Sequence, residues 1–459
     1  MVYARDLKSL DSNVMRVRAP PSAQVAGTAS TSSVSLRNVS RHEVVWDTSA
    51  LYFENFHMNQ LQIANRNIKL YVFIKIFAKR VFLPLTALYF IDFGGFTIRD
   101  IGLLSAFFSV IQLLAEVPTG YFADRIGRVA SIRVGAILAA SATTIYVLFH
   151  SKTGIYAGVM LEALGYSFFG GAGEAMIHDA LVVKKKEHEY TKILSRTMSI
   201  SLIANAILIT FVPMTYAIDP TYPFIIGTIA YLALLCFALF MHDVKRSISV
   251  VKLKVPDFSK IVSKRNIAIF GLTFGIISAL YTAPSDMFNV ALREYGVRID
   301  LIGWIYGLAS VLGAIIGPFI HYLRKIKLSS YLMLDLIMLV IVYVSAFTGS
   351  AMILGISIIL AISFWRYRRI IYQSYLLNIY PTNYKATLIS TMNNLEQLNS
   401  IWLPIFITFT IFHTSTRVGL GLIGLFAILI SPVFYFASLK FFHRNPVPIA
   451  LGNTAPDIV

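Results

Sequence analysis

The stretch Gly120-Tyr121-Phe122-Ala123-Asp124-Arg125-Ile126-Gly127-Arg128 places three charged residues in a short segment between two long apolar runs. These runs extend from Ile101 to Pro118 and from Val134 to Phe149. Glycines permit a tight backbone reversal, and charged residues stay outside the hydrocarbon where apolar segments cross a bilayer. The stretch therefore predicts a turn between two membrane-spanning helices.

The composition agrees with a membrane protein. The 459 residues are 56% hydrophobic and only 14% charged, whereas soluble proteins are typically about 45–50% apolar. Apolar stretches of the ~20 residues that span a bilayer recur about twelve times between Leu70 and Phe441. We predict an all-α integral membrane protein with twelve transmembrane helices in two pseudo-symmetric six-helix bundles.

Two halves are visible in the sequence. The segment Gly95 to Gly102 aligns with Gly296 to Gly303, whereas the counterpart of the charged turn, Gly317 to Lys327, lacks the aspartate. The predicted spans are 69–92, 99–120, 131–150, 154–180, 192–215, 222–242, 266–290, 299–321, 329–348, 351–378, 385–412 and 417–440. The predicted parts are a disordered tail (1–67), a first bundle (68–242), a linker (243–265), a second bundle (266–441) and a C-terminal tail (442–459).

The charge distribution predicts the orientation. The chain has 40 Lys and Arg against 23 Asp and Glu, and the basic residues gather in alternate loops, as the positive-inside rule describes. We therefore expect a multi-pass plasma-membrane protein with both termini in the cytoplasm, and no nucleic-acid partner. A short polar lead follows Met58, so we expect translation to begin there and residues 1–57 to be an upstream extension.

The charged turn resembles the signature loop between the second and third helices of the major facilitator superfamily, roughly Gly-x-x-x-Asp-Arg-x-Gly-Arg, and matches every fixed position. The segments Glu116 to Gly120 and Gly170 to Ala175 resemble a poorly characterised prokaryotic branch of that superfamily. The resemblance implies a rocker-switch carrier, in which two halves tilt about a site at the membrane midplane.

The same resemblance implies a conformational latch. Asp124 would engage the start of the eleventh helix near Lys385 to Leu388, where the positive end of the helix dipole favours a carboxylate. Arg125 and Arg128 would bind acidic or carbonyl groups, with Asp179 as one candidate. The latch set is Gly120, Asp124, Arg125, Gly127, Arg128 and Asp179. In the alternative interpretation, the loop only anchors the topology.

Charged residues inside spans suggest a site, because each costs ~2.5–3.5 kcal/mol at the bilayer centre unless it is paired or faces water. The tenth span contains Arg366, Arg368 and Arg369. Arg366 and Arg369 share a helix face, which the resemblance would direct into a central cavity. The candidate cavity residues are Lys75, Lys79, Glu174, His178, Arg366, Arg369 and Glu396. They form either a positive site for an anionic or polar substrate or a set of structural ion pairs in which the lysines extend to the surface.

Two further interpretations concern protons. Glu174 and His178 lie four residues apart and could exchange a proton as the site opens and closes, or His178 could simply cap its helix beside Asp179. Glu162 and Asp286 are predicted near the outer ends of their helices, where water solvates them.

Enzymatic motifs are missing from the sequence. It contains neither a phosphate-binding Gly-x-x-x-x-Gly-Lys-Ser/Thr loop nor paired cysteines with metal-ligand spacing. We therefore expect no enzyme activity, cofactor or metal. The prediction is a monomeric secondary active transporter of a small solute in the lipid bilayer. The alternative is a membrane sensor or scaffold that retains the fold.

Overall fold

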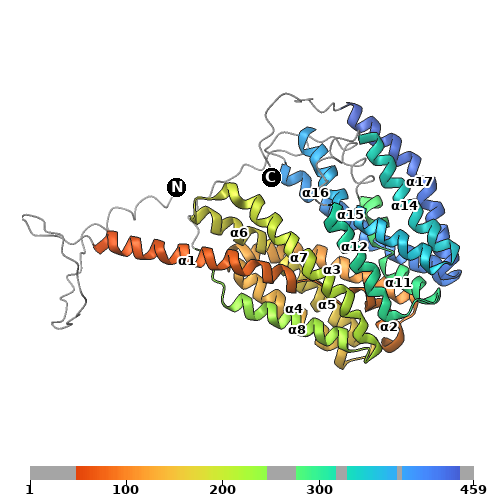
Figure 1. Cartoon of the computed structure of the whole chain (residues 1–459), viewed down its shortest axis with the longest axis horizontal. Helices are drawn as coiled ribbons and strands as arrows, with labels where there is room; N and C mark the ends of the chain where they lie inside the picture. The colour runs from red at the N-terminus through yellow and green to blue at the C-terminus, as the bar shows by residue number, and fades with distance from the viewer. Residues whose placement is uncertain (1–47, 245–274, 317–327, 380–384, 445–459) are drawn as a thin grey trace, which may run out of the picture. The chain divides into compact units, whose positions relative to one another are not determined.

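The computed structural model describes residues 48–244, 275–316, 328–379 and 385–444, and every regular element within these ranges is helical. By its internal contacts the chain divides into two units, Met1–Tyr52 and Phe53–Val459, and the second carries all the features below. The helices labelled in Figure 1 are α1 (Thr48–Phe77), α2 (Thr86–Gly94), α3 (Ile98–Arg125), α4 (Arg128–Leu148), α5 (Lys152–Phe169), α6 (Ala172–Val183), α7 (Tyr190–Phe211), α8 (Tyr222–Leu239), α11 (Ser285–Glu294), α12 (Ile302–Ile316), α14 (Leu328–Thr348), α15 (Ala351–Ile379), α16 (Lys385–His413) and α17 (Thr416–Arg444). Shorter elements are η1 (Leu83–Leu85), η2 (Glu187–Glu189), η3 (Pro213–Ala217), α10 (Ile277–Thr282) and η6 (Ile299–Leu301).

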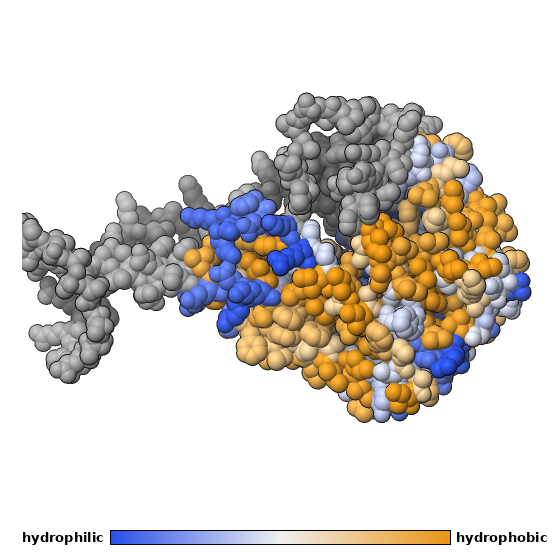
Figure 2. Space-filling view, viewed as in Figure 1, coloured by the Kyte–Doolittle hydropathy of each residue, from blue (hydrophilic) through white to orange (hydrophobic). Residues whose placement is uncertain are grey.

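The helices carry the apolar surface that a bilayer requires. Within the described ranges, nine helices are long and apolar enough to cross a membrane. Large apolar side chains point outward, with Val117 79% and Leu429 68% exposed. Figure 2 shows apolar residues over much of the visible face and a hydrophilic cluster where α6 and α7 meet. The all-helical, apolar character of the prediction is confirmed, although nine described spans are fewer than the twelve predicted.

The predicted first span, 69–92, is not one helix. Helix α1 ends at Phe77, and the chain then passes through the 3₁₀ turn η1, which contains Pro84, before α2 begins at Thr86. Proline lacks the N–H that an internal helical hydrogen bond needs, so it fits the first turn of η1 better than a continuous helix. Arg80 lies in this interruption.

The predicted fourth and seventh spans are interrupted as well. Between α5 and α6 the backbone breaks at Gly170 and Gly171, and Gly171 has a φ of 69°, which is strained for residues with a Cβ. Between α10 and α11 the chain turns at Ala283 and Pro284. Non-helical backbone at membrane depth is tolerated only inside protein or along a water-filled cavity. Each break is therefore expected either inside the protein or along a cavity.

The helices of residues 48–244 form the first half of the described chain, and those of residues 275–444 form the second. The two halves meet through close helix contacts. Helix α4 packs against α5 and α8, and α14 packs against α15 and α17, whereas α3 packs on α16 and α7 on α12 to join the halves. At Gly102 a Cβ would collide with Thr408, and at Gly303 it would lie 2.7 Å from the carbonyl oxygens of Ile209 and Thr210. Gly102 lies near the start of α3, and the predicted charged turn lies at the other end of this helix. Residues 120–125 are still helical, so the turn itself is confined to Ile126 and Gly127 before α4 begins at Arg128.

An ion pair reinforces this joint, since Arg293 Nη1 lies 2.7 Å from Asp92 Oδ1 of the other half. Tyr216 also donates a hydrogen bond to the Asp92 carboxylate. The ion pair joins the halves at the ends of α2 and α11, and Tyr216, from the same half as Asp92, holds the carboxylate in place.

The N-terminal prediction needs correction, because residues 48–67 belong to helix α1 rather than to a disordered tail. Asn67 is fully buried, and its amide donates a 2.7 Å hydrogen bond to the carbonyl oxygen of His242. Residues 1–47 lie outside the described ranges, as do the predicted linker beyond Val244, the counterpart of the charged turn (317–327) and the C-terminal tail beyond Arg444.

Candidate functional site

A buried ion pair lies where the first and fourth predicted spans meet. Arg80 Nε lies 2.7 Å from Glu162 Oε1, a charge contact that is not aligned as a hydrogen bond, while Arg80 Nη2 donates to Oε2 at 3.0 Å. Glu162 is fully buried, whereas the Arg80 side chain remains 21% exposed. The expectation that water solvates Glu162 is wrong, because Glu162 faces the interior of the first half.

Aromatic residues surround this pair. The Tyr146 hydroxyl donates a 2.8 Å hydrogen bond to Glu162 Oε2. The Arg80 guanidinium lies 5.1 Å from the ring centre of Phe108 and 5.8 Å from that of Tyr166, which places it over the faces of two aromatic rings. A charged hydrogen bond and two cation–π contacts fix Arg80 at the end of the interrupted helix.

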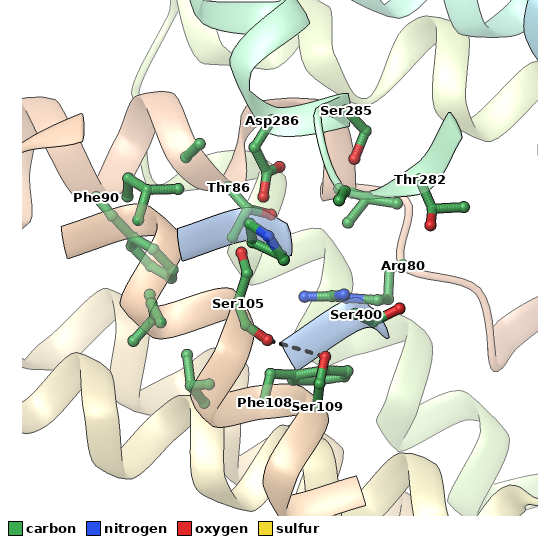
Figure 3. A pocket seen from close by; sticks show the side chains of 17 residues that line it. Arg80, Thr86, Phe90, Ser105, Phe108, Ser109, Thr282, Ser285, Asp286 and Ser400 are labelled. Atoms are coloured by element: carbon green, nitrogen blue, oxygen red, sulfur yellow. Dashed lines mark hydrogen bonds between the residues drawn. The ribbon is translucent and has the colours of Figure 1, made fainter. Parts of the chain in front are cut away.

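Arg80 lines a cavity of 290 Å³ between the two halves. This volume is near the lower end of small-molecule sites, which span roughly 300–1,000 Å³. Figure 3 shows Arg80 and Asp286 projecting into the same space from different segments. The polar residues that line the cavity are Arg80, Thr86, Ser105, Ser109, Thr282, Ser285, Asp286 and Ser400. Asp286, predicted to be solvated at a helix end, instead lies half-buried beside the break between α10 and α11.

A second buried pair lies within the other half. Arg368 Nε lies 2.7 Å from Asp335 Oδ2, and the two side chains are 3% and 0% exposed. The Tyr372 hydroxyl donates to the same carboxylate oxygen at 2.8 Å. Arg368 therefore packs into the second half, whereas Arg80 lines the cavity.

The predicted cavity residues of the first half lie elsewhere. Lys75 Nζ is 3.2 Å from Glu174 Oε1, so these two residues form an ion pair. Lys79 is exposed to solvent, and the charges of Lys75 and Arg366 both act on it. His178 is exposed and stacks edge-on against Tyr190 at 5.7 Å between ring centres. The described contacts join Glu174 to Lys75 and His178 to an aromatic ring.

In the second half, Arg366 packs against α12. Its Nη2 donates a 2.8 Å hydrogen bond to Ser310, and its side chain would lie 3.2 Å from a Cβ at Gly313. Glu396 is half-buried in α16. The side chain of Arg369 lies outside the described set, so the face it was predicted to share with Arg366 stays a prediction.

The charged turn contacts its own half. Arg128 Nη2 lies 2.6 Å from Asp124 Oδ1, and the Arg125 guanidinium lies 5.4 Å from the centre of the Tyr121 ring. Gly127 has a φ of 142°, and a Cβ there would collide with the side chain of Asp243. Asp243 Oδ1 accepts a 3.0 Å hydrogen bond from the backbone N–H of Val129 and so caps the start of α4.

Other parts of the predicted latch are less defined. Gly120 has open space around its Cα, and Asp179 is half-buried in α6. The side chains of Lys385 to Leu388, the predicted partners of Asp124, lie outside the described set. Arg133, which was not predicted to matter, donates to the carbonyl oxygens of Ala238 and Met241 and caps the end of α8.

Sequence reasoning missed the two pairs for different reasons. Glu162 and Arg80 are 82 residues apart, and only the fold brings them together. Asp335 stands alone in an apolar run, and that isolation was the available signal, because a lone carboxylate at membrane depth needs a partner.

Comparisons with known proteins agree with this architecture. The sequence pattern of the Major Facilitator Superfamily matches residues 70–404. The uncharacterized MFS-type transporter YxaM of Bacillus subtilis (strain 168) is 23% identical over 342 residues, which cover 71% of this chain and 83% of the relative.

Solved structures share the fold at low sequence identity. The nucleoside transporter NupG aligns with a TM-score of 0.69 at 12% identity, over 83% of this chain and 99% of its own. The POT family transporter PepTSo gives 0.64 at 12% identity over 83% and 99%, and a D-xylose-proton symporter gives 0.60 at 12% identity over 81% and 96%.

Proposed function

Because the chain belongs to the major facilitator superfamily of membrane transporters, we propose that it is a secondary active transporter that moves a small polar solute by alternating access. In this proposal, twelve helices form two six-helix bundles in the plasma membrane, both termini are cytoplasmic, and the protein acts as a monomer. The superfamily assignment supports the multi-pass membrane fold.

One observation carries the proposal: both halves contribute polar side chains to one cavity. Arg80, Ser105 and Ser109 come from the first half, and Thr282, Asp286 and Ser400 from the second. A charge or hydroxyl at membrane depth persists where it is paired or faces water. A solute bound here would touch both halves, so its binding can be coupled to their relative movement.

The helix breaks support movement around this cavity. The interruption at 78–82 carries Arg80, and the turn at Ala283 and Pro284 immediately precedes Asp286. Discontinuous helices are typical of transporter binding sites, because the interrupted backbone allows side chains to converge there. The joint around Gly102, Gly303 and the Asp92–Arg293 pair would form the closed outer side. In this proposal the cytoplasmic side is open.

The charged turn would regulate the opposite state. We retain the latch as a proposal, with Asp124 exchanging its Arg128 partner for the start of α16 when the cytoplasmic side closes. In the present state Asp124 pairs with Arg128, and its side chain is 59% exposed. The hydrogen bond from the Val129 backbone N–H to Asp243 would hold the start of α4 in place during that exchange.

Proton coupling is the second element of the proposal. Glu174 is 48% exposed and bound to Lys75, so protonation of Glu174 would release Lys75 toward the exposed Lys79. Like charges would then repel each other and favour a rearrangement of this face. His178, one turn further along α6, would accept or pass the proton.

The test is solute exchange in proteoliposomes that contain the purified full-length protein. Radiolabelled nucleosides, sugars, amino acids and dipeptides are tested for counterflow, with and without an imposed pH gradient. We expect exchange of one solute class, a more than tenfold loss in Arg80→Gln, and no loss in Arg298→Gln, a matched surface arginine that is 73% exposed.

Two outcomes separate the parts of the proposal. Absence of exchange for every solute class would favour a sensor or scaffold with this fold. Exchange that responds equally to the pH gradient in the wild type and in Glu174→Gln would remove Glu174 from the coupling mechanism while leaving transport intact.

A further inference from the structure

Asp286 is the carboxylate that lines the cavity. Arg80 is already paired with Glu162, so these two groups nearly cancel. Asp286 faces the same space, and the charged groups acting on it are Arg80 and Glu162. Among the described residues that line the cavity, the charged ones are Arg80 and Asp286. Because Arg80 is already paired with Glu162 behind the cavity wall, Asp286 favours a ligand that brings a positive group.

Arg80 nevertheless keeps donors for a second ligand group. An arginine has five N–H donors, and the described contacts of Arg80 with Glu162 use only its Nε and Nη2. Its side chain remains 21% exposed where it lines the cavity. In Figure 3 the guanidinium extends into the space below Asp286. A ligand carboxylate can therefore accept hydrogen bonds from Nη1 without displacing Glu162.

The two charges lie in one cavity of small-molecule size. Arg80 lies against Phe108, and Asp286 lines the same space from the first turn of α11. A small molecule that carries both an ammonium and a carboxylate can therefore contact both charges.

We infer that the transported solute is a small zwitterion, which places its ammonium group on Asp286 and its carboxylate on Arg80. This inference rests on the proposed transport function. Hydroxyls of Ser105, Ser285 and Thr282 line the same cavity, and Phe90 and Phe108 provide apolar walls for a side chain. The site therefore recognises both charges of one molecule and leaves its side chain to the aromatic walls.

The test uses probes that differ by one charge. The purified protein is incubated with L-serine, L-leucine and L-phenylalanine, with the amide of each, which lacks the carboxylate, and with the N-acetyl derivative, which lacks the ammonium group. Thermal stability and counterflow in proteoliposomes are measured. We expect at least one free amino acid to bind and exchange, and both of its derivatives to bind at least tenfold more weakly.

The variant Asp286→Asn separates recognition from folding. It should weaken binding of the free amino acid about tenfold, to the level of the N-acetyl derivative, and leave binding of the N-acetyl derivative itself unchanged. Asp300→Asn, a carboxylate paired with Arg298 at the surface, serves as the control.

Three results would overturn the inference. Equal binding of the amino acid and its two derivatives would exclude dual charge recognition, and an unchanged amino-acid preference in Asp286→Asn would exclude the assigned anchor. Counterflow of a nucleoside or sugar with none of any amino acid would refute the zwitterion while leaving transport standing. The absence of counterflow for every solute would refute transport as well.

Discussion

The two halves each bury an arginine–carboxylate pair, but in different surroundings. Arg80 and Glu162 lie beside the cavity, and Arg80 is 21% exposed, whereas Arg368 and Asp335 are sealed within the second half at 3% and 0%. Each carboxylate also accepts a 2.8 Å hydrogen bond from a tyrosine hydroxyl. The chemistry is nearly the same, and access to the cavity distinguishes a pair available to a ligand from one that only holds helices together.

The largest stability effect should come from the sealed pair. Asp335→Asn leaves the Arg368 charge buried without a counter-ion, which costs about 3–5 kcal/mol. We expect a strong fall in the melting temperature of the purified protein. Replacing both partners by apolar residues, Arg368→Met with Asp335→Leu, should restore most of the stability and keep solute exchange. If the double variant is as unstable as the single one, the pair is not a self-contained structural unit.

At the cavity-side pair, Arg80 and Glu162, a substitution should reduce solute exchange more than it reduces stability. In Glu162→Gln the Arg80 charge can reach cavity water, so we expect a smaller loss of about 1–3 kcal/mol. Solute exchange should fall more than tenfold, because Arg80 loses the partner that fixes its position. Thermal unfolding and counterflow, measured on the same preparation, check both values. A stability loss as large as that of Asp335→Asn would show that the two pairs do not differ in the way proposed.

Removing single hydroxyls sharpens the comparison. Tyr146→Phe and Tyr372→Phe each delete a hydrogen bond to a charged carboxylate, worth about 1.5–3 kcal/mol. Both variants should lower the melting temperature by similar amounts, but Tyr146→Phe alone should lower the exchange rate. Equal exchange rates in the two variants would contradict a special role for the cavity-side pair.

These pairs also show what a sequence can reveal. The all-helical, apolar character follows from hydropathy, and the superfamily follows from the charged motif at Gly120–Arg128. The division into two six-helix bundles stays a prediction. The helix breaks beside Arg80 and Asp286 are not predicted, although Pro84 and Pro284 stand at them, because the predicted spans are set by apolar length rather than by helix continuity. Pairing of Arg80 with Glu162 depends on how separate helices rotate against each other, which spacing within one helix cannot specify.

The smallest expected effect is a pH-dependent change in stability at Asp219. Hydrogen bonds from the Thr221 side chain and backbone to Asp219 lower the pKa of this exposed carboxyl in the connection between η3 and α8. A lowered pKa means that the unfolded chain binds more protons, so the stabilisation is present above the unfolded pKa and is lost as pH falls through the folded pKa. Asp219→Asn should slightly reduce the melting temperature at neutral pH and cause no change in strong acid. If Asp219→Asn lowers the melting temperature more in acid than at neutral pH, the pKa of Asp219 is not lowered by folding.

The contact between Asp243 and the start of α4 has a mechanical consequence. Because this aspartate also begins the segment that connects the halves, the connector is fastened at its upstream end to the loop that follows α3. The connector between the halves therefore leaves this contact at Val244.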